Sequence, residues 1–149
     1  MMSIRGLPAG ILFLAATVFA ADAGAAELKV LSVETMRPAL QELAKEFEAA
    51  SKHKLKIDYA TAADIEKKMD SEEEYDIVIV DDAITKKLNG AAKIAGGSTK
   101  VIAKQGPDHS YDVSTTNWTE QPNVDKELID FLTAPKAAEV YKAKGMQPG

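Results

Sequence analysis

Residues 75–82 of the chain read YDIVIVDD, and this stretch determines how the remaining sequence is interpreted. Four aliphatic residues in succession follow Asp76, so a strand at this position would be apolar on both faces. Strands of this kind are typical of parallel sheets that carry helices on both sides. We therefore expect residues 76–80 to form a central strand, which the acidic pair Asp81–Asp82 ends.

The sequence before this strand alternates between strand and helix patterns. Short apolar or alternating runs at 27–32 and 54–59 predict two further strands. Apolar residues at helical spacing predict helices at about 36–47 and 62–69. A strand–helix–strand–helix–strand order implies right-handed crossovers, and hence a three-layer α/β fold around a parallel sheet.

The second half of the chain is less regular. We expect a short helix at about 83–88, a strand at 99–104 and then a loop over residues 106–122, which are rich in turn-forming residues and show no period. Two helices are expected to close the chain, and the last ends near Lys144 with Gly145 as its C-terminal cap. The first of them places four apolar residues on one face: Val124, Leu128, Phe131 and Leu132.

The N-terminus has the features of a cleaved secretory signal. Arg5 precedes ten apolar residues at 11–20, and the small residues at 23–25 suit a signal peptidase. The apolar run is shorter than the roughly 20 residues that span a bilayer. We expect residues 1–25 to be removed and residues 26–149 to form one exported domain, with no membrane insertion after cleavage.

Composition and motifs exclude several classes of function. The chain has 18 basic and 23 acidic residues, a net charge of −5, which argues against nucleic acid as a partner. It has no cysteine, so disulfides, thiolate metal sites and thiol catalysis are excluded. His53 and His109 stand alone, without a second histidine at metal-ligand spacing. No nucleophile, metalloprotease or phosphate-loop motif is present, so we expect neither an enzyme nor a cofactor.

The candidate ligand site lies where the predicted strands end. Ligands of open α/β sheets bind beyond the carboxyl ends of the parallel strands, here at Thr35–Met36 and Thr61–Ala62. Thr35 is expected to cap the first helix through its hydroxyl, and Thr61 is expected to open the second helix in the same way. Two helix starts at neighbouring strand ends can converge on one small oxyanion, although ordinary helix caps produce the same pattern.

Other residues near these strand ends allow different interpretations. Glu34 with Asp81 or Asp82 can form a cation site, which would favour a metal or an amine over an anion. An acidic pair at a strand end is also a common helix cap or solvated turn. Tyr111 and Trp118, in the predicted loop, either line a pocket or seal the edge of the core.

Several segments resemble the periplasmic molybdate-binding type of solute-binding protein. The opening ELKVLSVETMRPALQELAKEFEAASKHKLKIDYATAADIEKKM, the strand YDIVIVDD and the ending DKELIDFLTAPKAAEVYKAKGMQPG are similar to that family over about residues 27–105 and 123–149. The resemblance implies a solute receptor of an ABC importer with a type II periplasmic-binding fold, which has two lobes.

The resemblance also implies ligand-binding residues. The family offers a serine hydroxyl and a backbone N–H after the first strand, which correspond here to Thr35 with Met36 beside it. A second serine falls near Ala62, with Thr61 one position earlier. Glu34 stands where the family has a small neutral residue, and its charge would repel an oxyanion at 4 Å by roughly 1–4 kcal/mol.

The resemblance is interrupted in the middle of the chain. The family builds a second α/β lobe between its matched halves, whereas only residues 106–123 stand there in this sequence. A complete strand–helix–strand unit needs about 30 residues. We therefore expect a three-layer parallel-sheet lobe of the type II fold, with a loop at 106–122 in place of most of the second lobe.

Two functional hypotheses follow from the sequence. The first is a periplasmic binding component of an ABC importer, which takes a small oxyanion of the molybdate, tungstate or sulfate type and passes it to a permease in the inner membrane. The second is a degenerate single-lobe module without a transport ligand, which acts in protein interaction or as a weak cation-binding site.

Overall fold

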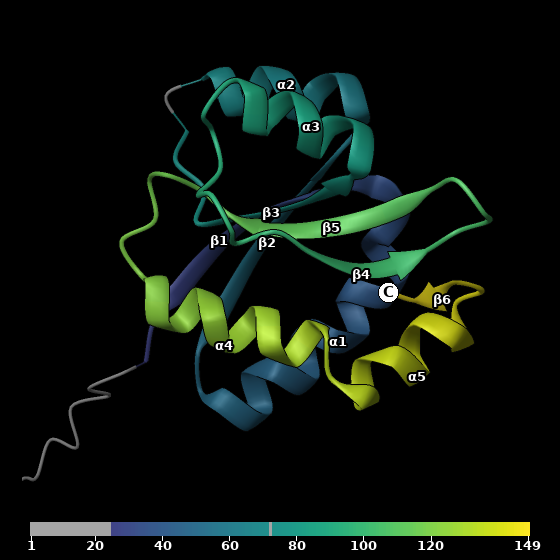
Figure 1. The fold of residues 1–149 in the computed structure, drawn as a ribbon. Coiled ribbons are helices and arrows are strands. Elements are labelled where there is room, and N and C mark those ends of the chain that lie inside the picture. Colours follow the sequence, from purple (N-terminus) through teal and green to yellow (C-terminus); the bar gives the residue numbers. More distant parts are fainter. Residues whose placement is uncertain (1–24, 72) are drawn as a thin grey trace, which may run out of the picture.

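A computed structural model describes residues 25–71 and 73–149 of the chain (Figure 1). The predicted signal sequence, apart from Ala25, lies outside the described residues. The elements follow in the order β1 (Glu27–Val33), the short 3-10 helix η1 (Glu34–Met36), α1 (Arg37–Ser51), β2 (Lys54–Ala60), α2 (Ala62–Asp70), β3 (Ile77–Asp81), α3 (Asp82–Gly90), β4 (Lys100–Lys104), β5 (Ser110–Thr115), α4 (Pro122–Leu132), α5 (Pro135–Ala143) and β6 (Gln147–Pro148).

The strands form one sheet of six, in the order β2-β1-β3-β5-β4-β6. β1 runs parallel to both β2 and β3, and β3 occupies an interior position. Residues 77–80 of β3 are all buried, which confirms that YDIVIVDD contains a central strand. The remaining pairs, β3·β5, β4·β5 and β4·β6, are antiparallel, so the prediction of a parallel sheet is right for three strands and wrong for the other half.

The predicted loop over residues 106–122 is wrong because Ser110–Thr115 forms β5, an interior strand between β3 and β4. Its polar residues gave no strand pattern in the sequence, yet Asp112 and Ser114 are buried. The hydroxyl groups of Ser114 and Thr99 are hydrogen-bonded at 2.7 Å. The link between β4 and β5 consists only of residues 105–109, so the chain passes directly from one strand to the next with no second lobe inserted between them.

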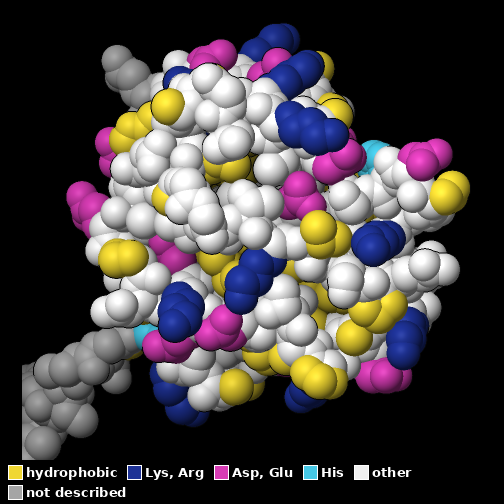
Figure 2. Space-filling model, in the orientation of Figure 1, with side chains coloured by type: hydrophobic (Ala, Val, Ile, Leu, Met, Phe, Trp, Pro, Cys, Tyr) yellow, Lys and Arg dark blue, Asp and Glu magenta, His cyan; other side chains and the backbone are white. Residues whose placement is uncertain are grey.

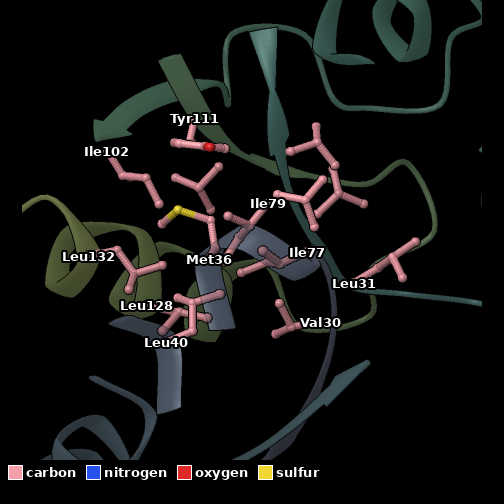
Figure 3. Close-up of a cluster of buried hydrophobic side chains, with 14 of the residues drawn as sticks. Val30, Leu31, Met36, Leu40, Ile77, Ile79, Ile102, Tyr111, Leu128 and Leu132 are labelled. Atoms are coloured by element: carbon pink, nitrogen blue, oxygen red, sulfur yellow. The ribbon is translucent and has the colours of Figure 1, made fainter. Parts of the chain in front are cut away.

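Helices cover both faces of the sheet and make three layers. α2 and α3 pack on one face, at the top of Figure 1, and α1, α4 and α5 lie on the other. The core beneath α1 and α4 is continuous and apolar (Figure 3). Burial of each such side chain contributes about 1.5–3 kcal/mol to folding. Its members include Val30, Met36, Leu40, Ile77, Ile79, Ile102, Tyr111, Leu128 and Leu132.

The two closing helices largely match the prediction. Leu128 and Leu132 of α4 are buried, and Val124 and Phe131 are partly buried against the same core. After α5, Gly145 has φ of +81°, and the following N–H, of Met146, donates to the carbonyl of Tyr141 at 2.9 Å. This is the predicted glycine cap, since a left-handed residue lets the chain satisfy the last carbonyls of the helix.

No helix in the described part of the chain is long and apolar enough to cross a membrane.

Candidate functional site

The carboxyl ends of β1, β2 and β3 meet at one edge of the sheet, as predicted. Val33 of β1 is paired with Ala60 of β2, so the turns that follow, at 34–36 and 61–63, begin side by side. Because β3 runs parallel to β1 on its other side, its own end at Asp81 lies at the same edge. The fold therefore brings the four predicted ligand residues, Thr35, Met36, Thr61 and Ala62, to neighbouring positions.

The turn after β1 differs from the prediction. Thr35 is not a helix cap: η1 is preceded by Val33 and α1 by Met36, and neither position makes a side-chain cap hydrogen bond. The chain makes a 3-10 turn first, so the N–H of Arg37 is already satisfied by the carbonyl of Glu34. The Thr35 side chain is exposed and makes no hydrogen bond among the described residues, which leaves its hydroxyl accessible.

Met36 is fully buried, with 0% of its side chain exposed, and it points into the core (Figure 3). Any contribution of Met36 to ligand binding is therefore limited to its backbone. The same residue anchors the turn, since its side chain packs in the cluster that contains Ile79 and Leu128.

The start of α2 has the predicted cap. The Thr61 hydroxyl accepts from the N–H of Asp64 at 3.3 Å and donates to the Asp64 carboxylate at 3.1 Å. The N–H groups of Ala62 and Ala63, the first two residues of the helix, have no acceptor in the described part of the chain. Both alanines are exposed, so these two donors face solvent at the strand ends.

The carboxylate of Glu34 at this edge is paired with a basic residue. Arg37 donates to both of its carboxylate oxygens, from Nε at 2.7 Å and from Nη2 at 2.8 Å. The guanidinium also lies over the ring of Tyr59, 4.3 Å from the centroid. Hydrogen bonding from Arg37 lowers the pKa of Glu34, which stays ionised with its charge compensated. The expected repulsion of an oxyanion by Glu34 is therefore weaker than the sequence alone indicated.

Arg37 was missed as a site residue, although the spacing that reveals it is visible in the sequence. Residues three apart on a helical turn are neighbours, and Glu34 and Arg37 have that separation and opposite charges. The contact with Tyr59 was not visible, because it depends on the pairing of β1 with β2.

The acidic residues after β3 act as a helix cap and an ion-pair partner. Asp81 accepts from the N–H of Ile84 at 3.0 Å and caps α3. Asp82 pairs with Lys86 at 3.5 Å. No group of three or more acidic or histidine side chains in the described residues is arranged to hold a metal ion. The cation site built on Glu34 with Asp81 or Asp82 therefore has no support in the geometry.

An open groove extends from this edge between α2 and α3. Its walls carry charges of both signs, which Figure 2 shows interleaved over the top of the molecule. Lys87 of α3 reaches Glu66 of α2 at 2.8 Å and joins the two helices. The groove is lined by Ala62, Ala63, Glu66, Lys67, Asp70, Asp81, Ala83, Ile84 and Lys87.

The aromatic residues of the predicted loop have two different roles. Tyr111 is 2% exposed and seals the core, with its hydroxyl donating to the side chain of Gln105 at 3.0 Å. Trp118 is 39% exposed and lines a surface hollow with Lys29 and Asp76, near the beginnings of β1 and β3. Neither residue lines the groove between α2 and α3.

Comparison with known protein families identifies the class of protein to which this lobe belongs. The model of the bacterial extracellular solute-binding protein family matches residues 28–107, more than half of the chain. The chain therefore belongs to that family, which consists of binding proteins and not of enzymes. The match confirms the predicted class, and the family description places its members outside the cytoplasm.

Solved structures of the same fold include two proteins described as molybdenum or molybdate binding. The substrate-binding domain of a putative molybdenum ABC transporter from Clostridium difficile has a TM-score of 0.74 and 9% identity, covering 84% of this chain and 100% of its own. The periplasmic molybdate-binding protein of Azotobacter vinelandii has a TM-score of 0.73 and 12% identity, covering 82% and 99%.

A third structure, described as the tungstate ABC transporter from Geobacter sulfurreducens, has a TM-score of 0.60 and 11% identity, covering 78% of this chain and 98% of its own. At these identities the likeness establishes the fold, a lobe of the periplasmic-binding type. A comparison with curated protein sequences gave no match.

Proposed function

We propose that the protein is the periplasmic binding component of an ABC importer and that its ligand is a small oxyanion of the molybdate, tungstate or sulfate type. The ligand is held at the carboxyl ends of β1 and β2, by the hydroxyl of Thr35 and by backbone groups of Met36 and Ala62. The Thr61 hydroxyl joins them by turning its single hydrogen from the Asp64 carboxylate to the ligand. The protein then passes the oxyanion to a permease in the inner membrane.

The observation that carries this proposal is the exposed first turn of α2. Two N–H groups without an acceptor among the described residues, those of Ala62 and Ala63, follow Thr61, and the turn that contains the exposed Thr35 begins beside this one. Helix N-termini bind anions through such N–H groups, supported by the helix dipole. The Arg37–Glu34 pair supports the proposal because it compensates the carboxylate that precedes Thr35 in the chain.

Thermal unfolding of the purified protein with and without candidate ligands tests this function. Molybdate, tungstate, sulfate and phosphate are compared with Ca²⁺ and Mg²⁺ at equal ionic strength. A ligand at 100 times its dissociation constant adds about 2.7 kcal/mol of stability. The proposal requires a shift with at least one oxyanion. Absence of a shift at millimolar concentrations of every oxyanion would instead favour a single-lobe module without a transport ligand.

A matched pair of variants locates the binding site. Thr61→Val removes the hydroxyl at the start of α2 and is expected to reduce the oxyanion shift. Thr133→Val removes a hydroxyl that bonds only to carbonyls at the end of α4, and it is expected to leave the shift unchanged. An equal loss of the shift in both variants would place binding elsewhere.

A further inference from the structure

One acidic residue far from the candidate site is buried in surroundings that do not stabilise a negative charge. Asp125, in the first turn of α4, is 0% exposed, and neither of its carboxylate oxygens has a hydrogen-bond partner among the described residues. Buried carboxylates are normally paired or hydrogen-bonded, because an isolated buried charge is costly. None of the ion pairs within residues 25–71 and 73–149 includes Asp125.

The neighbours of Asp125 form a short polar chain. The Thr119 hydroxyl donates to Oδ1 of Asp76 at 3.2 Å and accepts from the N–H of Gln121 at 3.1 Å. The other oxygen of Asp76 accepts from the N–H of Lys29 at 2.9 Å. The carbonyl of Asp76 accepts from the N–H of Thr116 at 3.0 Å. Asp76 therefore ties the segment that leads into α4 to the beginning of β1.

The charges around Asp125 oppose its ionisation. Burial and, to a smaller extent, the nearby Asp76 carboxylate raise the pKa of Asp125 to about 6, against the opposing effect of the Thr119 hydroxyl. The hollow that Asp76 lines is acidic on its other sides and contains one basic residue, Lys29; its lining residues are Glu27, Lys29, Glu74, Asp76, Trp118, Glu120 and Gln121. The helix start favours an anion, but Pro122 removes one N–H from that turn.

A proton on Asp125 supplies the hydrogen that is missing from this series of hydrogen bonds. Thr119 directs its single hydrogen to Asp76, and donating it to an ionised Asp125 instead would leave Asp76 without this bond. A protonated Asp125 has a hydrogen of its own and can donate to the Thr119 oxygen, which has room for a second acceptor contact. All members of the chain are then satisfied, from α4 through Thr119 and Asp76 to the backbone of Lys29.

We propose that Asp125, Thr119 and Asp76 form a proton-dependent chain of hydrogen bonds that holds the first turn of α4 against the beginnings of β1 and β3. When Asp125 is protonated, all hydrogen bonds of this chain are formed. Loss of the proton leaves a buried carboxylate without a donor of its own and loosens residues 117–125. This chain of hydrogen bonds is separate from the proposed oxyanion site, since it lies at the opposite ends of the same parallel strands.

Hydrogen exchange between pH 4 and pH 7, corrected for intrinsic exchange rates, measures the local opening of residues 117–125. A carboxyl whose pKa is about 6 in the closed state and 3.8 in the open state changes the opening constant by roughly 50-fold over this range. Opening is expected to increase as the pH rises. Residues 135–143 of α5 serve as an internal reference that does not follow this change.

Asp125→Asn carries the amide hydrogens that a protonated acid would supply, so it is expected to abolish the pH dependence. Asp130→Asn, at an exposed position of the same helix, is the matched control and keeps the wild-type response. Thr119→Val is expected to loosen the segment already at pH 4. Carbon NMR of the wild-type Asp125 carboxyl gives its titration directly. Equal pH dependence in wild type and Asp125→Asn, or an NMR titration near pH 4, would overturn the proposal.

Discussion

The carboxylates in the turns after β1, β2 and β3 differ in their surroundings from Asp125 near the opposite ends of these strands, although Asp112 of β5, paired with Val80, is a buried carboxylate near the carboxyl end of β3. At the carboxyl ends, Glu34, Asp64 and Asp81 are at least partly exposed, and each has a partner: Arg37, the Thr61 hydroxyl and the N–H of Ile84. At the amino ends, Asp125 is completely buried, and its carboxylate oxygens have no hydrogen-bond partner within residues 25–71 and 73–149. Both ends contain several carboxylates, so the number of acidic residues does not distinguish them.

The difference shows what each end can do. The exposed carboxylates at the carboxyl ends leave the Thr35 hydroxyl and the N–H groups of Ala62 and Ala63 facing solvent, whereas the Thr61 hydroxyl is bonded to Asp64. A buried and uncompensated carboxylate cannot exchange ligands with solvent, and its free energy depends on a proton instead. This difference is why we propose a binding function for the carboxyl ends and a pH response of Asp125 near the amino ends.

The largest expected effect comes from the floor of the carboxyl-end site. Met36→Ala removes a side chain that is fully buried beneath the turn and is expected to reduce the free energy of unfolding by about 2–5 kcal/mol. Urea unfolding measures this loss. Met36→Leu conserves most of the volume and should cost less than about 1.5 kcal/mol. Equal losses in the two variants would show that the cavity is not the cause.

The next largest effect is expected for Asp125, near the amino ends of the strands. Its raised pKa determines how the free energy of unfolding changes with pH. The pKa of Asp125 is raised in the folded state to about 6, so the stability associated with its proton is complete below pH 4 and is lost as the pH rises through 6. Asp125→Asn should therefore increase the free energy of unfolding by up to about 3 kcal/mol at pH 7. At pH 4 the two proteins should unfold at the same urea concentration.

A smaller effect is expected for the cap of α2. Thr61→Ala removes the oxygen that accepts from the N–H of Asp64, at a cost of about 1 kcal/mol. Thr61→Ser keeps this oxygen and should be close to wild type. Chemical unfolding at pH 7 separates the two, and a loss in the serine variant as large as in the alanine variant would argue against capping.

The smallest effect is expected for Glu34→Gln. The ion pair with Arg37 is exposed, and such pairs contribute little to stability, so the melting temperature should not change measurably. Oxyanion affinity should increase, because the substitution removes a negative charge and frees the Arg37 guanidinium. Calorimetric titration at low and high salt measures this, and weaker binding would show that Glu34 orients Arg37 for the ligand.

The fold was predictable where periodicity and burial agree. The run of aliphatic residues at 77–80 and the helical stripes that contain Leu40 and Leu128 predicted the central strand and the helices that cover it. The order of elements also predicted that the carboxyl ends of β1, β2 and β3 meet at one edge, as the structure shows. β5 was not predictable, because its buried Asp112 and Ser114 give the composition of a loop.

The site was predictable only in position. Thr61 caps its helix as expected, because a threonine before a helical run has few other roles. Thr35 does not, because η1 intervenes, and a three-residue turn has no period that a sequence reveals. The state of Asp125 depends on the contact of α4 with the loop before it and with β3, and contacts between distant segments leave no local pattern.

The five-residue link at 105–109 also affects how the chain folds. β5 must insert between β3 and β4, and the entropic cost of bringing two strands together grows with the length of chain between them. A hairpin makes the β4–β5 pairing a local event, which forms early and then offers a ready edge to β3. In a lobe whose chain is interrupted by a whole domain at this point, the two strands are far apart in sequence and their pairing is not local. The short link therefore gives this lobe a nucleus of its own.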